Sequence, residues 1–344
     1  MLSGPKPGKD RRDATGGAVR HKPRALIVTE HKPTRKRVKR ALLALGCEVK
    51  ESPCDRQACC EHMAQPLELC IIDVDNDGIE IDALVDTLRQ VNPSCPVILT
   101  ADVIARTSLL NLVVDKMVSN VIAKRPGATV RSRAVDELEF ITTCSKLLSD
   151  DIFGIDKYLP GGLFDTQEEV VKGTEDRYRV VECLAGYLES LSCPERMISL
   201  ICTATDELIM NAIFSAPTDE AGAHRYADAD RSAPLVLEPH ELVTTRYVCD
   251  GYNVVVSVVD NFGSLSRATL VEHLRNGWLG HQKAVRWDTG GAGLGLHLVF
   301  SSAVQFIANI EPGVRTELIT IYYIREGLRR LSEMGHSLNL FYRT

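Results

Sequence analysis

Five short strand patterns, most of them apolar, follow one another between residues 24 and 124, and helical patterns separate them. The runs occupy residues 24–29, 47–52, 67–75, 96–101 and 119–124. A regular alternation of strand and helix at this spacing predicts a doubly wound α/β fold, in which helices cover both faces of a five-stranded parallel sheet. Because such folds bind ligands at the carboxyl ends of their strands, the residues that end each run are the first candidates for a site.

Polar residues stand at these ends. Glu30 and His31 follow the first run, and Asp73 lies within the third. Thr100 lies in the fourth run, and Lys124 ends the fifth. This set resembles that of the response-regulator receiver domain, a flavodoxin-like fold, over nearly all of residues 23–126.

The resemblance implies that Asp73 accepts a phosphoryl group, that Mg²⁺ is held by Glu30 and Asp73, and that Thr100 and Lys124 contact the phosphoryl group. In-line transfer to a carboxylate needs a metal and a cation to offset charge. The chain departs from the family at His31, which replaces one of two acids, because Mg²⁺ prefers oxygen ligands to imidazole. The loop after Asp73 is also shorter than in the family and lacks its proline. A pseudo-receiver used for docking is the alternative.

The second half predicts a different architecture. Helical patterns are expected over 166–190 and 195–217, with Ser192 in a capping box before the second helix. Asp250-Gly251 and Pro312-Gly313 each join two apolar runs and predict two hairpins. These elements predict an α/β sandwich with a mixed, largely antiparallel sheet.

Three separated segments of this half carry candidate site residues. Glu207 and Asn211 are four residues apart, so they share one face of a helix, where they can position a water and hold a hard metal ion. Asp260 ends an apolar strand, where a carboxylate is costly unless something donates to it. Residues 290–295 read GGAGLG at the start of a helical pattern, where bare backbone N–H groups can meet an anion. Each has a plain alternative: a hydrogen-bonded pair, a turn cap and a flexible hinge.

Taken in order, DELIMNA, VVDNFGS, GGAGLGL and RTELITI resemble the ATP-binding domain of the GHKL superfamily over roughly residues 165–325. The resemblance implies that ATP and Mg²⁺ bind here. Asn211 would coordinate Mg²⁺, Glu207 would act as general base, and Asp260 would accept from the adenine amino group. The other implied nucleotide contacts are Gly263 in the first glycine box, Gly291, Gly293 and Gly295 at the lid and helix start, and Thr316 in the adenine pocket. Charge and position add Lys283 and Arg286 as phosphate contacts.

The first glycine box departs from the family. Its pattern is D-x-G-x-G, whereas here Phe262 stands where the first glycine normally gives room. The ring could line the pocket or partly fill it. The implied nucleotide site is therefore open to two interpretations, a working pocket and a degenerate one.

Composition and charge bound the protein class. The chain has 344 residues, 44% of them hydrophobic, which is typical of a globular protein with two domains. Its eleven cysteines form no C-x-x-C pair, the start lacks a secretory core, and no apolar run reaches ~20 residues, so we expect a cytoplasmic protein without a membrane span. The expected divisions are a disordered basic tail (1–22), the receiver-like domain (23–126), a helical connector (127–163), the ATP-binding domain (164–326) and a C-terminal extension (327–344).

The resemblances together predict a bacterial-type signalling regulator. In it, a receiver-like module is coupled to an ATP-binding module that phosphorylates or sequesters a partner protein in the manner of anti-sigma serine kinases. A sigma factor, its antagonist or another signalling protein is the expected partner, and a homodimer is possible. No histidine has the context of a kinase acceptor, so a self-contained histidine kinase is excluded. The alternative is a non-enzymatic scaffold. A nucleic-acid regulator is not expected, because the basic residues 1–40 accompany no DNA-reading motif.

Overall fold

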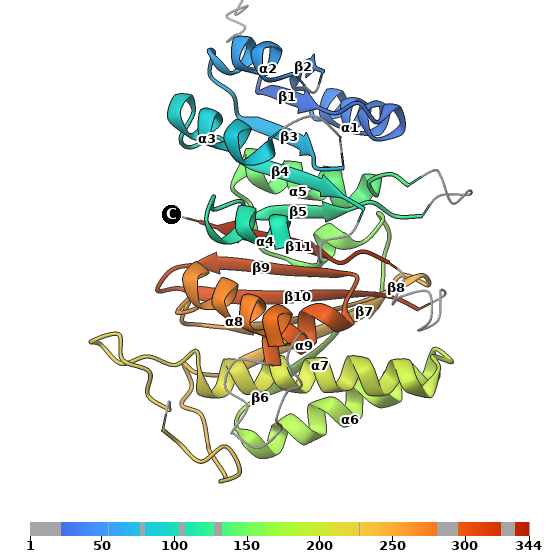
Figure 1. Ribbon diagram of the computed structural model, residues 1–344. Coiled ribbons are helices and arrows are strands. Elements are labelled where there is room, and N and C mark those ends of the chain that lie inside the picture. The colour runs from blue at the N-terminus through green and yellow to red at the C-terminus, as the bar shows by residue number, and fades with distance from the viewer. Residues whose placement is uncertain are drawn as a thin grey trace, which may run out of the picture.

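The computed structural model describes residues 22–53, 55–75, 80–102, 107–126, 133–226, 228–280, 295–324 and 334–343. Within this part of the chain the strands form one sheet of 11, in the order β2-β1-β3-β4-β5-β11-β9-β10-β8-β7-β6. Figure 1 shows the sheet running the length of the molecule, with the first half of the chain at one end and the second half at the other. The two halves therefore share a single backbone scaffold.

The first half contains the predicted parallel sheet. Its strands are β1 (Arg24–Val28), β2 (Glu48–Ser52), β3 (Leu69–Asp73), β4 (Val97–Ala101) and β5 (Asn120–Ala123). All four pairings among them are parallel, and the order 2-1-3-4-5 is that of the flavodoxin-like doubly wound folds. The predicted fold class of this half is confirmed, and the region is receiver-like.

Helices cover both faces of this parallel sheet. On one face lie α1 (Lys32–Ala44) and α5 (Glu137–Ser149), which share a core with the strands, and on the other lie α2 (Arg56–Met63), α3 (Ile81–Val91) and α4 (Thr107–Val114). The expected connector contains α5, yet Phe140 and Cys144 of this helix pack with Val38 and Leu42 of α1. In the structure α5 therefore completes the core of the first half.

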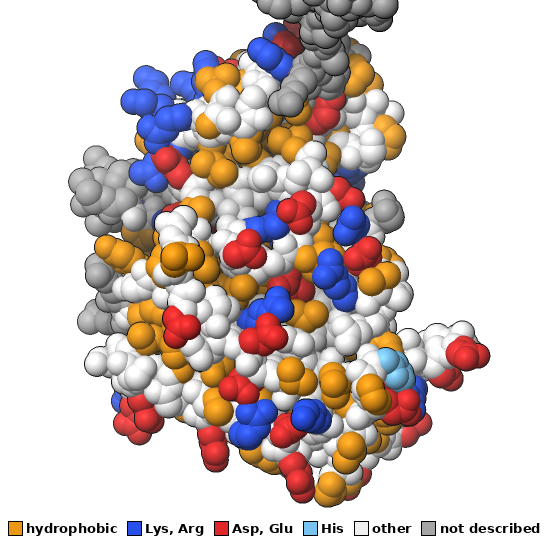
Figure 2. Space-filling model, turned by 180° about the vertical axis from the view of Figure 1, so that it is seen from behind, with side chains coloured by type: hydrophobic (Ala, Val, Ile, Leu, Met, Phe, Trp, Pro, Cys, Tyr) orange, Lys and Arg blue, Asp and Glu red, His pale blue; other side chains and the backbone are white. Residues whose placement is uncertain are grey.

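The outer face of α1 carries the basic run of residues 32–40. Lys32, Lys36, Arg37, Lys39 and Arg40 are exposed. Seen from behind, basic side chains gather over α1 at the top of the molecule (Figure 2). Lys39 pairs with Glu51 and Arg40 with Glu137, so part of this charge is met locally on a solvated helix face.

The second half has the predicted mixed, largely antiparallel sheet. Its strands are β6 (Gln167–Val171), β7 (Val243–Cys249), β8 (Asn253–Asp260), β9 (Gln305–Glu311), β10 (Arg315–Tyr323) and β11 (Ser337–Tyr342). Pairings from β6 through β9 are antiparallel, and β11 is parallel to β9. One face packs against α6 (Thr174–Ser190), α7 (Glu195–Phe214), α8 (Arg267–Gly280) and α9 (Gly295–Ser302), and the other against the short 3₁₀ helix η1 (Ile155–Tyr158).

The strand β11 joins the two halves. It was expected to be part of a C-terminal extension, but it lies in the middle of the sheet, antiparallel to β5 and parallel to β9. Beside it the buried guanidinium of Arg125 donates to Glu139 Oε2 at 3.1 Å, to Ser337 Oγ at 3.0 Å and to Val304 O at 3.1 Å. The junction of the two halves along β11, which we call the seam, is thus held by backbone pairing and by a buried ion pair.

Two predicted elements of the second half are wrong. Residues 167–171 are not the start of a helix, because they pair with β7 as the outermost strand, and Gly173 separates them from α6. Ser192 is not a helix cap, because its backbone is left-handed (φ 57°) and its N–H donates to Glu189 O. The helix α7 instead begins after Pro194, which has no side-chain cap. The helix α8 was not predicted.

Among the described helices, α7 alone passes a length and composition test for crossing a membrane, with a mean hydropathy of 1.4. About 61% of the tested window is buried inside the fold. A core helix passes the same test, and the packing of α7 between the sheet and α6 is that of a core helix.

Gly186→Ala is expected to raise the free energy of unfolding by about 0.5–1 kcal/mol, because glycine inside a helix loses more backbone entropy than alanine. Gly186 lies on the exposed side of α6, and a Cβ there would meet no atom within 4 Å. Gly313, in the turn between β9 and β10, is the matched control, because its surroundings are equally open but its φ is 72°. Gly313→Ala should lose about 1–2 kcal/mol from left-handed strain alone. Denaturant unfolding measures both, and a loss of stability in Gly186→Ala would contradict this account of α6.

Candidate functional site

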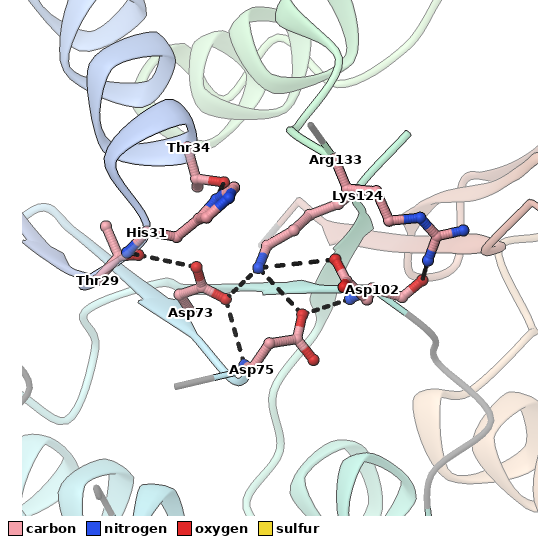
Figure 3. Close-up of polar contacts among 8 residues, drawn as sticks. All are labelled: Thr29, His31, Thr34, Asp73, Asp75, Asp102, Lys124 and Arg133. Atoms are coloured by element: carbon pink, nitrogen blue, oxygen red, sulfur yellow. Dashed lines mark hydrogen bonds and ion pairs between the residues drawn. The ribbon is translucent and has the colours of Figure 1, made fainter. Parts of the chain in front are cut away.

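A cluster of three carboxylates and one ammonium lies around the buried pair of Asp73 and Lys124, at the carboxyl ends of β3, β4 and β5; we call it the Asp73 cluster. Lys124 Nζ lies 2.7 Å from Asp73 Oδ1, 3.0 Å from Asp75 Oδ2 and 3.8 Å from Asp102 Oδ1 (Figure 3). Thr29 Oγ1 donates to Asp73 Oδ2 at 2.8 Å. The sequence analysis placed Asp73 and Lys124 in one site, through a phosphoryl group that both would contact, and the structure brings the two side chains together directly.

The position of Lys124 determines the electrostatics of this cluster. Its side chain is only 3% exposed. Burial alone would lower the pKa of Lys124, but the attraction and hydrogen bonds of Asp73 and Asp75 outweigh burial, and the pKa is raised. The lysine is therefore charged at neutral pH and offsets carboxylates that would otherwise repel one another.

The remaining residues predicted for this site are arranged differently. His31 Nδ1 forms a hydrogen bond of 2.8 Å with Thr34 Oγ1, and in Figure 3 its ring lies against Thr34 and away from Asp73. Glu30 is exposed. Thr100 is adjacent to Asp73 in the β3–β4 register and fully buried, and its hydroxyl has no partner among the described residues.

The predicted magnesium site does not fit this arrangement. Across the described ranges, no group of three or more His, Cys, Asp or Glu side chains is placed to hold a metal ion. The carboxylates instead surround Lys124. The sequence analysis did not predict that Asp75 and Asp102 belong to this cluster. The available signal was an acid within two residues of the end of each of the strands β3 and β4.

A second constellation lines a cavity of about 300 Å³ between α7, α9 and the sheet, which we call the α7 cavity. Its walls include Glu207 and Asn211 of α7, Asp260 of β8, Thr316 of β10 and Gly295 of α9. These five residues come from four elements that are distant in the sequence, and each was predicted as a site residue. Most of the remaining lining is apolar and includes Leu208, Val258 and Leu318.

Glu207 and Asn211 lie together on the cavity side of α7. Asn211 Nδ2 lies 3.4 Å from Glu207 Oε1. Burial raises the pKa of Glu207, and the charge of Arg231 partly offsets that rise. A Cβ on Gly295 would lie 1.7 Å from Glu207 Oε1, so a side chain at position 295 would displace the carboxylate from its present place.

Asp260 forms another wall of the cavity and is 7% exposed. Its Oδ1 accepts from the N–H groups of Phe262 at 2.9 Å and Gly263 at 3.2 Å. Burial raises the pKa of Asp260, and these two N–H groups partly offset the rise. Thr316 lies directly opposite in the β8–β10 register, which places a second polar side chain beside this carboxyl.

The turn after Asp260 needs glycine at position 263. Gly263 has φ 59°, and a Cβ there would lie 2.0 Å from the backbone oxygen of Glu311. Phe262 is not among the residues that line the α7 cavity; its ring lies edge-on to His240 at 6.0 Å. The phenylalanine therefore neither lines nor fills this cavity.

Several lining residues were missed by the sequence analysis, and four of them carry a titratable side chain. His224, Tyr226 and Arg231 come from the irregular stretch 217–240, and His273 comes from α8. The guanidinium of Arg231 lies 5.9 Å from the centre of the Phe214 ring. Residues 217–240 have no periodic pattern from which the positions of His224, Tyr226 and Arg231 could have been predicted. Lys283, Arg286, Gly291 and Gly293 lie outside the described residues.

Comparison with known proteins found solved structures that are similar to part of the chain, but no family model and no curated protein. A CheY-like response regulator receiver domain protein from Methanospirillum hungatei JF-1 is similar in structure, with 17% identity and a TM-score of 0.28 over 31% of this chain and 85% of that chain. A response regulator protein from Burkholderia pseudomallei with a phosphorylated aspartic acid has 16% identity and a TM-score of 0.28 over 38% of this chain and 72% of that chain. At these scores, the receiver-like description of the first half depends on its strand order.

Proposed function

We propose that the chain is a signalling regulator whose α7 cavity binds an adenine nucleotide with Mg²⁺, in the manner that the resemblance to the GHKL superfamily implies. One observation carries the proposal. Glu207 and Asn211 of α7 and Asp260 of β8 line one cavity with Thr316 and Gly295, although these elements lie far apart in the sequence. None of these residues would specify a ligand alone, but together they offer an acceptor for a base and polar groups for phosphates.

The base end of the site is the wall formed by Asp260 and Thr316. Asp260 Oδ1 is committed to the backbone N–H groups of Phe262 and Gly263. The second carboxyl oxygen would accept from the exocyclic amino group of adenine. The apolar side chains of Val258, Leu318 and their neighbours would cover the faces of the base.

The phosphate end is the wall formed by α7 and the start of α9. Asn211 Oδ1 and phosphate oxygens are hard ligands that suit Mg²⁺, which would supply charge neutralisation there. Arg231 also lines the cavity and adds positive charge. Glu207, with its raised pKa, would accept the proton of an attacking hydroxyl, either water or a partner's serine.

The partner would be a protein of the sigma-factor or antagonist type, and the receiver-like half would be the input module. A non-enzymatic scaffold is the second candidate. The Asp73 cluster favours it, because Lys124 already meets the charge of the proposed phosphoryl acceptor and the described residues offer no metal cluster. In that case the first half acts by contacts alone.

Asp260→Asn tests the nucleotide proposal. Isothermal titration calorimetry of the full chain with ADP and Mg²⁺ should show binding that the substitution weakens by about 10- to 100-fold, the value of a hydrogen bond to a charged acceptor. Guanine carries an oxygen where adenine carries the amino group, so the unaltered chain should prefer ADP to GDP. The substitution should reduce that preference.

The same variant has a built-in control for folding. Asparagine can still accept from Phe262 and Gly263, so the turn is kept. Because the pKa of Asp260 is raised in the folded state, its contribution to stability is complete in acid and is lost as the pH rises through the raised value. Asp260→Asn should therefore be at least as stable as the unaltered chain at neutral pH. An unaltered chain that binds no adenine nucleotide at about 5 mM would refute the proposal.

A further inference from the structure

The irregular stretch 217–240 brings one arginine to the wall of the α7 cavity. The stretch follows α7 in the chain and is drawn in yellow in Figure 1. Arg231 lines the cavity, and its guanidinium lies 5.9 Å from the centre of the Phe214 ring. Within the part of the chain that the structure describes, the side chain of Arg231 forms no hydrogen bond and no ion pair within 4 Å. Its donors are therefore not committed to another described residue.

Two contacts place this guanidinium over one face of α7. Glu207, Asn211 and Phe214 stand at positions i, i+4 and i+7 of the helix, so they share a face, and all three line the cavity. Arg231 approaches Phe214 at one end of this row. At the other end, burial raises the pKa of Glu207 and the charge of Arg231 opposes that rise. Asn211 lies between the two, so the positive charge faces the part of α7 where the proposed Mg²⁺ would bind.

Hydrogen bonds fix the stretch on both sides of Arg231. Before it, the hydroxyl of Tyr226 donates to Oε2 of the buried Glu241 at 2.9 Å. After it, the N–H of Leu235 donates to Thr174 Oγ1, at the start of α6, at 2.9 Å. The backbone that carries the guanidinium is thus positioned before any ligand binds. A positioned group loses less entropy on binding, so it can contribute more to affinity.

Guanidinium groups are well suited to bind phosphate, because their planar N–H donors can meet two phosphate oxygens at once. In the proposed complex, Asn211 would hold Mg²⁺, and Glu207 would face the hydroxyl that attacks the terminal phosphate. Arg231 acts on the same face of α7, whereas the base wall of Asp260 and Thr316 belongs to β8 and β10. The terminal phosphate is therefore the part of the nucleotide that this guanidinium would meet.

We propose that Arg231 binds the terminal phosphate of ATP and thereby makes the α7 cavity prefer a nucleoside triphosphate to a diphosphate. The inference rests on the proposed nucleotide function and adds to it the residue that sets phosphate specificity. ADP lacks the terminal phosphate, so with ADP the exposed guanidinium would stay hydrated and contribute little to affinity. The preference requires binding alone, so it applies whether or not the chain turns ATP over.

Isothermal titration calorimetry of the full chain in Mg²⁺ tests the proposal with three ligands. They are adenylyl imidodiphosphate, which is an ATP analogue that resists hydrolysis, ADP and adenosine. We expect Arg231→Gln to weaken binding of the ATP analogue by about 10- to 100-fold, the value of hydrogen bonds to a charged group. The affinities for ADP and adenosine should change by less than about threefold. Arg231→Lys keeps the charge without the planar donors, so it should lose only part of the affinity for the analogue.

Arg196→Gln is the matched control. Arg196 is an exposed arginine of α7 that does not line the cavity. Its substitution removes the same charge from the chain and should leave the affinities for all three ligands unchanged. Thermal unfolding of each variant establishes that it is folded.

Two results would overturn the inference and leave the nucleotide proposal standing. One is an affinity for the ATP analogue that Arg231→Gln does not change. The other is an equal loss of affinity for the analogue and for ADP, which would place the guanidinium at the inner phosphates. In both cases, ADP binding that Asp260→Asn weakens would still support the nucleotide site. An unaltered chain that binds neither nucleotide at about 5 mM would overturn both proposals.

Discussion

Lys124→Met should lower the free energy of unfolding by about 3–5 kcal/mol at neutral pH, the usual cost of removing one partner from a buried ion pair. Asp73 and Lys124 have side-chain exposures of 1% and 3%, so solvent cannot replace the lost ammonium. Because the pKa of Lys124 is raised, its contribution is complete at neutral pH and is lost only as the pH rises through that value. Urea unfolding at pH 7 measures the change.

Two comparisons make this result specific. Lys116→Met removes a lysine that pairs with Asp86 on the surface, and it should leave the unfolding midpoint nearly unchanged. Acidification should narrow the gap between Lys124→Met and the unaltered chain, because protonated carboxyls no longer repel one another. Equal effects of the two lysine variants would mean that the Asp73 cluster does not stabilise the fold.

Glu207→Gln should reduce ATP turnover by about 10²- to 10⁴-fold, the contribution of a positioned general base. The amide keeps the shape of the side chain beside Gly295, so ADP affinity should change little. Since burial raises the pKa of Glu207 and only the ionised form accepts a proton, turnover of the unaltered chain should increase with pH through that raised value. A coupled assay for ADP release over a pH series measures both effects.

The neighbouring Asp206 provides a matched control. Burial also raises its pKa, but its carboxylate pairs with Arg177 at 3.1 Å and does not line the α7 cavity. Asp206→Asn should therefore retain turnover. If Glu207→Gln turned over ATP as fast as the unaltered chain, the base assignment would fail. If the unaltered chain bound ATP without turnover, the non-enzymatic scaffold would be the better account.

The sequence predicted the elements whose side chains face a core along their whole length. The strands β1, β3, β4 and β5 are buried on both faces and appear as continuous apolar runs, and the turns at Gly251 and Gly313 have the positive φ that glycine favours. The strand β6 could not be recognised, because its polar side chains pair with partners elsewhere. Glu168 meets Arg246, and Glu169 meets Arg179.

The site residues also divide into those with a local sequence pattern, which could be predicted, and those positioned by distant parts of the chain, which could not. Four-residue spacing correctly placed Glu207 and Asn211 on one face of a helix, because that geometry is local. The contacts of Asp75 and Asp102 with Lys124 depend on the directions in which two loops leave the sheet. The position of Arg231 in the wall of the α7 cavity depends on the irregular stretch 217–240. Neither has a periodic signal. The contribution of β11 to the seam depends on strands far away in the chain.

The central place of β11 also has a consequence for how the protein is made. The N–H of Ala123 is bonded to the hydroxyl of Ser337, which is synthesised 214 residues later. At 5–20 residues per second, a ribosome needs on the order of 10–40 s to cover that distance. During this interval the open edge of β5 is a template that any free strand can join. The nascent chain is therefore exposed to strand exchange with a neighbouring copy, and folding helpers that shield β5 would improve its yield.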